Sequence, residues 1–149
     1  MRTTSSVGRM VAVLVVGMVL AAVQTEEIVV KEGEKIAFMG DSITQEGARP
    51  NGYVRLVISG LEANGVKATA IPAGISGHKS NQMLARLKKD VLDKKPDWMT
   101  LSCGVNDVWH GARGVPLEDY KKNITQIIEQ CQAANVKVVI LTATIDRKS

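Results

Sequence analysis

The sequence predicts an α/β protein in which a parallel sheet carries helices on both faces. Segments typical of strands alternate with segments typical of helices, in the order β-α-β-α-β-α-β. The strand segments are short continuous apolar runs, which is typical of strands buried on both faces. Hydrophobic residues make up 45% of the 149 residues and aromatic residues only 3%, so the expected core is aliphatic.

Local patterns give the bounds of these segments. The predicted strands span residues 36–39, 68–71, 98–103 and 136–142, and the predicted helices span 53–64, 83–92 and 116–131. Pro72 is expected to close the second strand, because proline donates no hydrogen bond to a ladder. Pro116 suits the first turn of the last helix. In a sheet of this kind, ligands bind in the loops beyond the carboxyl ends of the strands.

Residues 1–24 have the pattern of a secretory signal peptide. Arg2 and Arg9 precede an apolar run over residues 10–23, which is shorter than the roughly 20 residues that span a bilayer. The sequence thus predicts an exported protein, periplasmic or secreted, with a domain over 25–149 and no membrane span after signal removal. An uncleaved signal anchor is the alternative.

Charge and cysteine content exclude several classes of partner. Removing Arg2 and Arg9 reduces the net charge from +4 to +2, and the remaining charges form no basic patch interleaved with aromatics. A nucleic-acid partner is therefore not expected. Cys103 falls at the end of a predicted strand and Cys131 within a predicted helix, so two buried thiols are favoured over a disulfide. Their spacing matches no metal motif, and no metal is predicted.

Three strand ends carry residues suited to acyl transfer. Ser42 follows the first strand in Gly-Asp-Ser-Ile-Thr, Gly74 follows the second in Ala-Gly-Ile-Ser-Gly, and Asn106 follows the third in Gly-Val-Asn-Asp. A serine hydroxyl can attack an ester carbonyl, and fixed N–H donors can stabilise the resulting oxyanion. Taken singly, these motifs also fit a helix cap or a tight turn.

Together the three motifs resemble the SGNH, or GDSL, hydrolase family. The resemblance implies a flavodoxin-like three-layer sandwich, of which about four of five strands are present here. It implies Ser42 as nucleophile, with Ser42, Gly74 and Asn106 as the oxyanion hole, and no cofactor. Asp41 and His110 are predicted to bind substrate. The implied substrate is a carboxylic ester, either an O-acetylated carbohydrate or a short-chain lipid.

The family's catalytic Asp-x-x-His motif is expected after a fifth strand, whereas this sequence reaches Ser149 soon after the fourth. We therefore expect a truncated domain without its catalytic base and with impaired activity. Asp107 and His110 have the same spacing, but this segment starts directly after Asn106, which disfavours His110 as the base. The alternatives are a non-catalytic module that binds a carbohydrate or ester, and a flavin domain, although no phosphate-binding loop is apparent. The pattern does not predict an oligomeric state.

Overall fold

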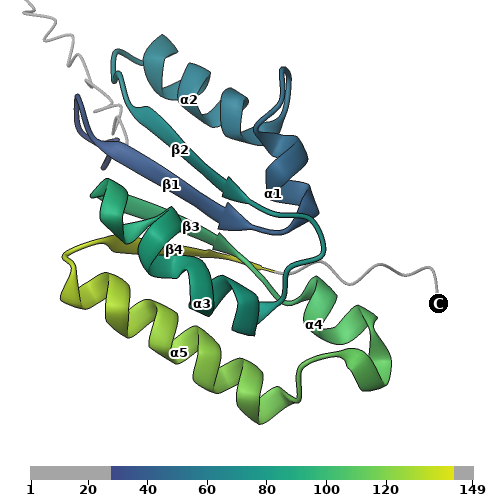
Figure 1. Cartoon of the computed structure of the whole chain (residues 1–149). Coiled ribbons are helices and arrows are strands. Elements are labelled where there is room, and N and C mark those ends of the chain that lie inside the picture. Colours follow the sequence, from purple (N-terminus) through teal and green to yellow (C-terminus); the bar gives the residue numbers. More distant parts are fainter. Residues whose placement is uncertain (1–27, 143–149) are drawn as a thin grey trace, which may run out of the picture.

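The computed structural model describes residues 28–142. The predicted signal segment and residues 143–149 lie outside this range. Four strands form one parallel sheet, in the spatial order β2-β1-β3-β4 (Figure 1). They are β1 (Lys35–Gly40), β2 (Thr69–Gly74), β3 (Trp98–Ser102) and β4 (Lys137–Leu141). The predicted α/β class and strand order along the chain are confirmed.

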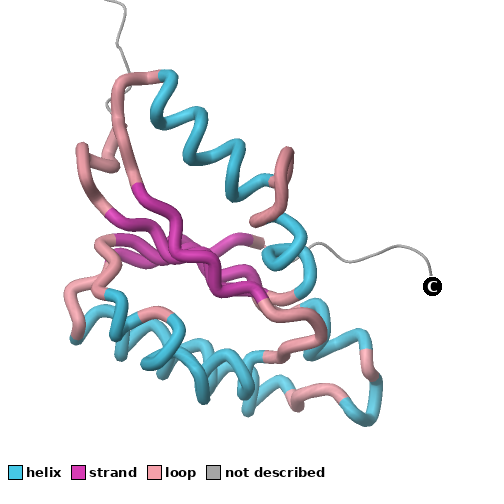
Figure 2. The backbone as a smooth tube through the Cα atoms, turned by 45° about the horizontal axis from the view of Figure 1, so that its top comes forward, coloured by secondary structure: helices cyan, strands magenta, loops and turns pink. Residues whose placement is uncertain are grey.

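Helices cover both faces of this sheet (Figure 2). One face carries α1 (Ser42–Gly47) and α2 (Tyr53–Ala63), and the other carries α3 (Ser80–Asp90) and α5 (Leu117–Ala133). The short helix α4 (Val105–Trp109) follows β3, and two 3₁₀ turns complete the described elements, η1 (Leu92–Lys94) and η2 (Gly111–Arg113). No helix within residues 28–142 is long and apolar enough to cross a membrane.

The core has two parts, one on each face of the sheet. The larger part joins the sheet to α3 and α5 through fully buried side chains that include Met83, Leu87 and Ile127. The smaller part places Val54 of α2 against Phe38 of β1. In each long helix, apolar residues recur at spacings of three and four, so each helix buries one face against the sheet, as the sequence predicts. The sheet is therefore held rigid beneath the loops that follow its strands.

One of the two edge strands, β2, differs from its prediction. Pro72 does not close its strand: β2 continues to Gly74, and Pro72 lies opposite Phe38 in the register. Only β1 pairs with β2, and an edge strand tolerates proline because its outer side needs no ladder hydrogen bonds. At the other edge, Ile140 of β4 is 56% exposed, as expected for a strand that is paired on one side only in the described part of the chain.

Two short helices begin at the carboxyl ends of strands; they were not predicted as separate elements, although a helix cap was one interpretation of each motif. In α1, the Asp41 side chain caps the first turn, and in α4 the chain enters through Gly104 with φ of +128°. That dihedral lies in a region that favours glycine. Both helices are too short to produce an apolar period in the sequence. They lie at the end of the sheet toward which the strands point (Figure 1).

Candidate active site

Ser42 is the first residue of α1 and follows β1 by one residue. The backbone N–H of Ile43 donates to Asp41 Oδ1 at 3.0 Å, which fixes the turn that carries Ser42. Ser42 is half-buried, and its hydroxyl has no side-chain hydrogen bond to any other residue between 28 and 142. The hydroxyl is therefore held at the rim of the sheet without being engaged by the fold.

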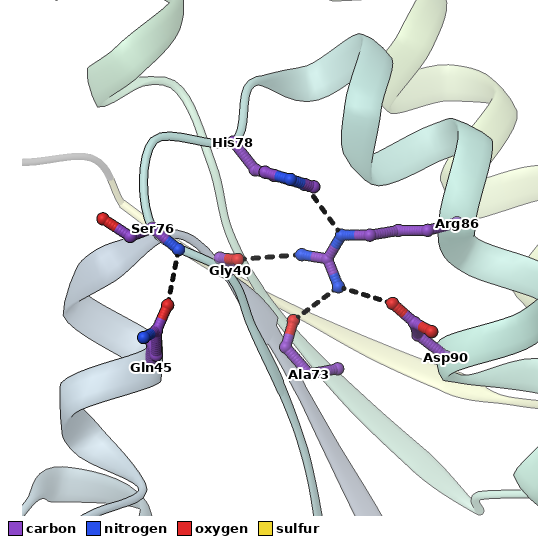
Figure 3. A network of polar contacts seen from close by, with 7 residues as sticks. All are labelled: Gly40, Gln45, Ala73, Ser76, His78, Arg86 and Asp90. Atoms are coloured by element: carbon purple, nitrogen blue, oxygen red, sulfur yellow. Dashed lines mark hydrogen bonds and ion pairs between the residues drawn. The ribbon is translucent and has the colours of Figure 1, made fainter.

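Gly74 lies against the first turn of α1. A Cβ atom at this position would be 2.2 Å from the backbone nitrogen of Gln45 and 2.6 Å from the carbonyl carbon of Thr44. Only glycine permits this approach without moving backbone. The loop after Gly74 is tied to the same helix, because Ser76 N–H donates to Gln45 Oε1 at 2.7 Å (Figure 3).

Asn106, in α4, joins the loops together. Its Nδ2 donates to Asp41 Oδ2 at 3.3 Å and to the backbone carbonyl of His78 at 3.2 Å. Asp41 directly precedes Ser42, and His78 lies in the loop after Gly74. The structure thus brings the three predicted residues, Ser42, Gly74 and Asn106, to one rim, while their catalytic roles stay a prediction.

Asp41 and His110, the two predicted substrate-binding residues, are placed differently. Asp41 is only 2% exposed, and its two oxygens accept from Ile43 and Asn106. A buried carboxylate that is already hydrogen-bonded holds the loops together, so direct substrate contact by Asp41 is not supported. His110 lies at the end of α4, half-exposed, and within the described part of the chain it does not hydrogen-bond to Ser42.

Asp107 anchors α4 to α3, a role that the sequence analysis missed. The side chain is 4% exposed, and its Oδ1 accepts from the backbone N–H of Ser80 at 3.0 Å and from the Ser80 hydroxyl at 2.5 Å. Asn123 of α5 in turn donates to that hydroxyl at 3.0 Å. The carboxylate also suits the positive end of the α3 dipole. This network fixes the residue next to Asn106.

Arg86 of α3 is the second residue that the sequence analysis missed (Figure 3). Its guanidinium donates to the carbonyls of Gly40 at 2.9 Å and Ala73 at 2.8 Å, which precede Asp41 and Gly74. It also pairs with Asp90 at 3.1 Å, and its side chain is only 10% exposed. The one signal in the sequence is that Arg86 follows buried Met83 by three residues and so lies beside the apolar face of the helix.

The surroundings of His78 favour its neutral form. Arg86 Nε donates to His78 Nδ1 at 3.1 Å (Figure 3). Burial, followed by the positive charge of Arg86, lowers the pKa of His78 below its usual 6.5, and Asp90 opposes this shift. The Nδ1 atom that would accept a proton is already used as an acceptor. His78 is therefore poorly suited to be a base for Ser42 through this nitrogen.

The lowered pKa of His78 predicts a loss of stability in mild acid. Below the unfolded-state value of 6.5, the unfolded chain takes up a proton before the folded chain does. The stabilisation from neutral His78 is thus complete above that pH and is lost as the pH falls through the folded-state pKa. We expect His78→Gln to flatten the dependence of Tm on pH between about 7 and 5. Parallel curves for the two proteins would contradict this.

Neither cysteine is suited to nucleophilic chemistry. Both are free and buried, as predicted. Burial and the neighbouring Asp107 carboxylate raise the pKa of Cys103, and burial raises the pKa of Cys131 to about 11. Thiols of this kind are not thiolates near neutral pH. Across residues 28–142, no group of three or more metal-ligating side chains is placed to hold a metal ion.

Comparison with known proteins gives a consistent family match. Residues 38–148 match the GDSL-like lipase/acylhydrolase family. Among curated relatives, an acetylxylan esterase of Geobacillus stearothermophilus is 31% identical over 132 residues, covering 74% of this chain and 59% of the relative. Thioesterase 1/protease 1/lysophospholipase L1 of Escherichia coli K12 is 32% identical over 75 residues, covering 50% of this chain and 35% of the relative.

Solved structures that superpose on this chain include acetylxylan esterases. A mutant of the acetylxylan esterase Axe2 from Geobacillus stearothermophilus superposes with a TM-score of 0.69 at 31% identity, covering 76% of this chain and 61% of that one. The acetyl xylan esterase AlAXEase superposes with a TM-score of 0.65 at 37% identity, covering 71% and 56%. The chain thus spans about 60% of the length of the acetylxylan esterases that it matches.

Proposed function

Because this chain belongs to the GDSL-like lipase/acylhydrolase family, we propose that it forms the nucleophile-bearing part of a serine ester hydrolase. The observation that supports this most directly is the joining of the Ser42, Gly74 and Asn106 loops through the side chain of Asn106. In the proposed reaction, Ser42 Oγ attacks the ester carbonyl and its proton passes to a base. The tetrahedral intermediate then expels the alcohol, and water hydrolyses the acyl-enzyme.

The proposed oxyanion hole consists of the backbone N–H groups of Ser42 and Gly74 and the side-chain amide of Asn106. An amide nitrogen carries two protons, and both are used in the resting site. We infer that Asn106 exchanges its longer bond, to Asp41 at 3.3 Å, for a bond to the oxyanion. Asp41 would retain its bond from Ile43 N–H, so the loop would keep its shape.

We propose that the general base is not among the residues of this chain. The sequence contains two histidines, His78 and His110, and neither hydrogen-bonds to Ser42 in the described part of the chain. Catalytic mutants of Axe2 replace a serine, an aspartate and a histidine, the last two being three positions apart. The chain alone is thus expected to retain only the residual catalysis of binding and oxyanion stabilisation, about 10³–10⁴ over water.

We propose an O-acetylated carbohydrate as substrate, because both structural neighbours above are acetylxylan esterases. A short-chain lipid ester is the alternative. Incubation with acetylated xylo-oligosaccharide, followed by proton NMR, separates hydrolysis from binding. Release of acetate that depends on Ser42 supports the hydrolase. Shifts of the oligosaccharide signals with no acetate release, even in a form supplied with a base, would instead indicate the non-catalytic binding module.

Removal of the Asn106 amide is expected to slow hydrolysis about 10²–10³-fold, as the loss of one oxyanion donor does in other acyl-transfer enzymes. The change is Asn106→Ala, and the measured quantity is kcat for an aryl acetate in a form that carries a base. Asn81→Ala is the matched control. Asn81 is exposed on α3, and its side chain accepts from the backbone N–H of Gln82 rather than binding Asp41 or His78. Equal kcat values for the two variants would exclude Asn106 from the oxyanion hole.

The export of the protein stays a proposal. Residues 1–24 lie outside the described range, so the structure does not bear on a signal peptide. One curated relative, YqeF of Bacillus subtilis, carries the name of a lipoprotein and is 29% identical over 73 residues. Amino-terminal sequencing of protein from the periplasm or medium tests the proposal, and a sequence that begins at Met1 would contradict cleavage.

A further inference from the structure

We propose that Arg86 is a positioning residue that sets the separation between Ser42 and Gly74 in the candidate oxyanion hole. The inference rests on the proposed function for its catalytic consequence. Its structural basis is the network in Figure 3, in which one guanidinium reaches the ends of both β1 and β2. Arg86 also donates to His78, but no catalytic role has been assigned to it above.

The two carbonyls that Arg86 binds lie just before the two proposed backbone donors of the oxyanion hole. Gly40 is separated from Ser42 by Asp41 alone, and Ala73 directly precedes Gly74. The bonds to these carbonyls come from different nitrogens, Nη2 to Gly40 at 2.9 Å and Nη1 to Ala73 at 2.8 Å. A planar guanidinium has a fixed angle between these donors. A rigid group therefore bridges the two strand ends at the last pairs of the parallel ladder, Met39 with Ala73 and Gly40 with Gly74.

The guanidinium is itself held in place. Asp90, one turn later in α3, accepts from Nη1 at 3.1 Å, and His78 Nδ1 accepts from Nε at 3.1 Å. The Arg86 side chain is 10% exposed, so water has little access to compete for these hydrogen bonds. Hydrogen bonds from a charged donor are also stronger than neutral ones. The Arg86–Asp90 ion pair is largely shielded from water. Arg86 therefore links α3 to the loops that follow β1 and β2.

A second bond makes the same junction sensitive to Arg86. The Gly40 carbonyl accepts from the backbone N–H of Ile75 at 3.1 Å as well as from Arg86. Loss of the guanidinium would leave the Gly40 carbonyl with the Ile75 N–H, at the end of the ladder that pairs Gly40 with Gly74. The Ile75 amide is therefore a local reporter of this junction, and it can be observed without any catalytic activity.

The test uses Arg86→Gln and Arg86→Lys in the full chain, with Asp90→Asn as the control that removes the ion pair but keeps both carbonyl bonds. Amide hydrogen exchange is measured by NMR at Ile75 and, for comparison, at Leu101 in β3. Affinity for 4-fluorophenylboronic acid, which forms a tetrahedral adduct with a reactive serine, is measured by fluorine NMR. Lysine keeps the charge but lacks the two-pronged geometry.

Both Arg86 variants should speed exchange at Ile75 about tenfold or more, as expected for the loss of roughly one charge-assisted hydrogen bond, and leave Leu101 unchanged. They should weaken boronate binding by a similar factor, while Asp90→Asn stays within about twofold of the wild type. Affinity for uncharged xylo-oligosaccharide should not change, because a positioning role acts on the tetrahedral state.

Three results would overturn the inference. Wild-type exchange at Ile75 in Arg86→Gln would show that the guanidinium does not hold the junction. Uniformly faster exchange, including at Leu101, would show a role in global stability alone. Full recovery in Arg86→Lys would show that charge suffices. If wild-type protein does not bind the boronic acid, or binding survives Ser42→Ala, the proposed function fails, and the exchange comparison still decides whether Arg86 holds the loops.

Discussion

Ser42→Ala is expected to abolish ester hydrolysis in a form of the protein that carries a catalytic base. Such a form can be made by joining the carboxyl-terminal segment of the acetylxylan esterase relative to this chain. Restoring a base and its orienting carboxylate should raise kcat for an aryl acetate by about 10³-fold or more, since loss of triad members costs about 10⁴–10⁶ in other serine enzymes. Ser42→Ala should remove that whole gain, because the base then has no hydroxyl to activate.

The matched control is the same extended protein with the histidine of the added segment replaced by alanine. It should be as slow as the Ser42→Ala variant, because residues of one triad act as a unit. The outcome that contradicts our interpretation is full turnover by the 149-residue chain that disappears with His110→Ala. The active site would then be complete within the loops described above, and Asp107 and His110 would need new roles.

The fold could be predicted from the sequence because each long element has a strong period. In α5, for example, buried Ile127 and Cys131 are four residues apart, as the inner face of a helix requires. The end of β2 was predicted wrongly because Pro72 stops a central strand but not an edge strand. Which strands lie at the edges depends on the strand order in space, and local sequence carries little information about that order.

The site shows the same division between local and long-range information. The predicted residues Ser42, Gly74 and Asn106 could be found because each follows a strand, and parallel strands end at one rim. Arg86 and Asp107 could not be found in this way. Arg86 acts on carbonyls 13 and 46 residues earlier, and Asp107 on Ser80, 27 residues earlier. Both depend on how α3 packs against the sheet.

Substitution of Gly74 by alanine is expected to lower both the free energy of unfolding and kcat. The new Cβ would lie 2.2 Å from Gln45 N and 2.6 Å from the Thr44 carbonyl carbon, and both of these are backbone atoms. Backbone cannot rotate away as a flexible side chain can, so β2 and α1 must separate. Overpacking of this kind typically lowers the free energy of unfolding by about 1–3 kcal/mol. The shift also moves Gly74 N–H away from Ser42.

Gly60→Ala provides the matched control, because the same chemical change there should have the opposite sign. Gly60 is exposed within α2, and a Cβ at this position meets no atom within 4 Å. Alanine in a helix interior is favoured over glycine by about 0.5–1 kcal/mol, so this variant should be more stable than the wild type. Chemical denaturation measures both changes, and kcat in the base-carrying form should fall only for Gly74→Ala. A Gly74→Ala protein with wild-type stability and wild-type kcat would show that α1 does not pack against the end of β2 as described, and Gly74 would then have no steric reason to be glycine.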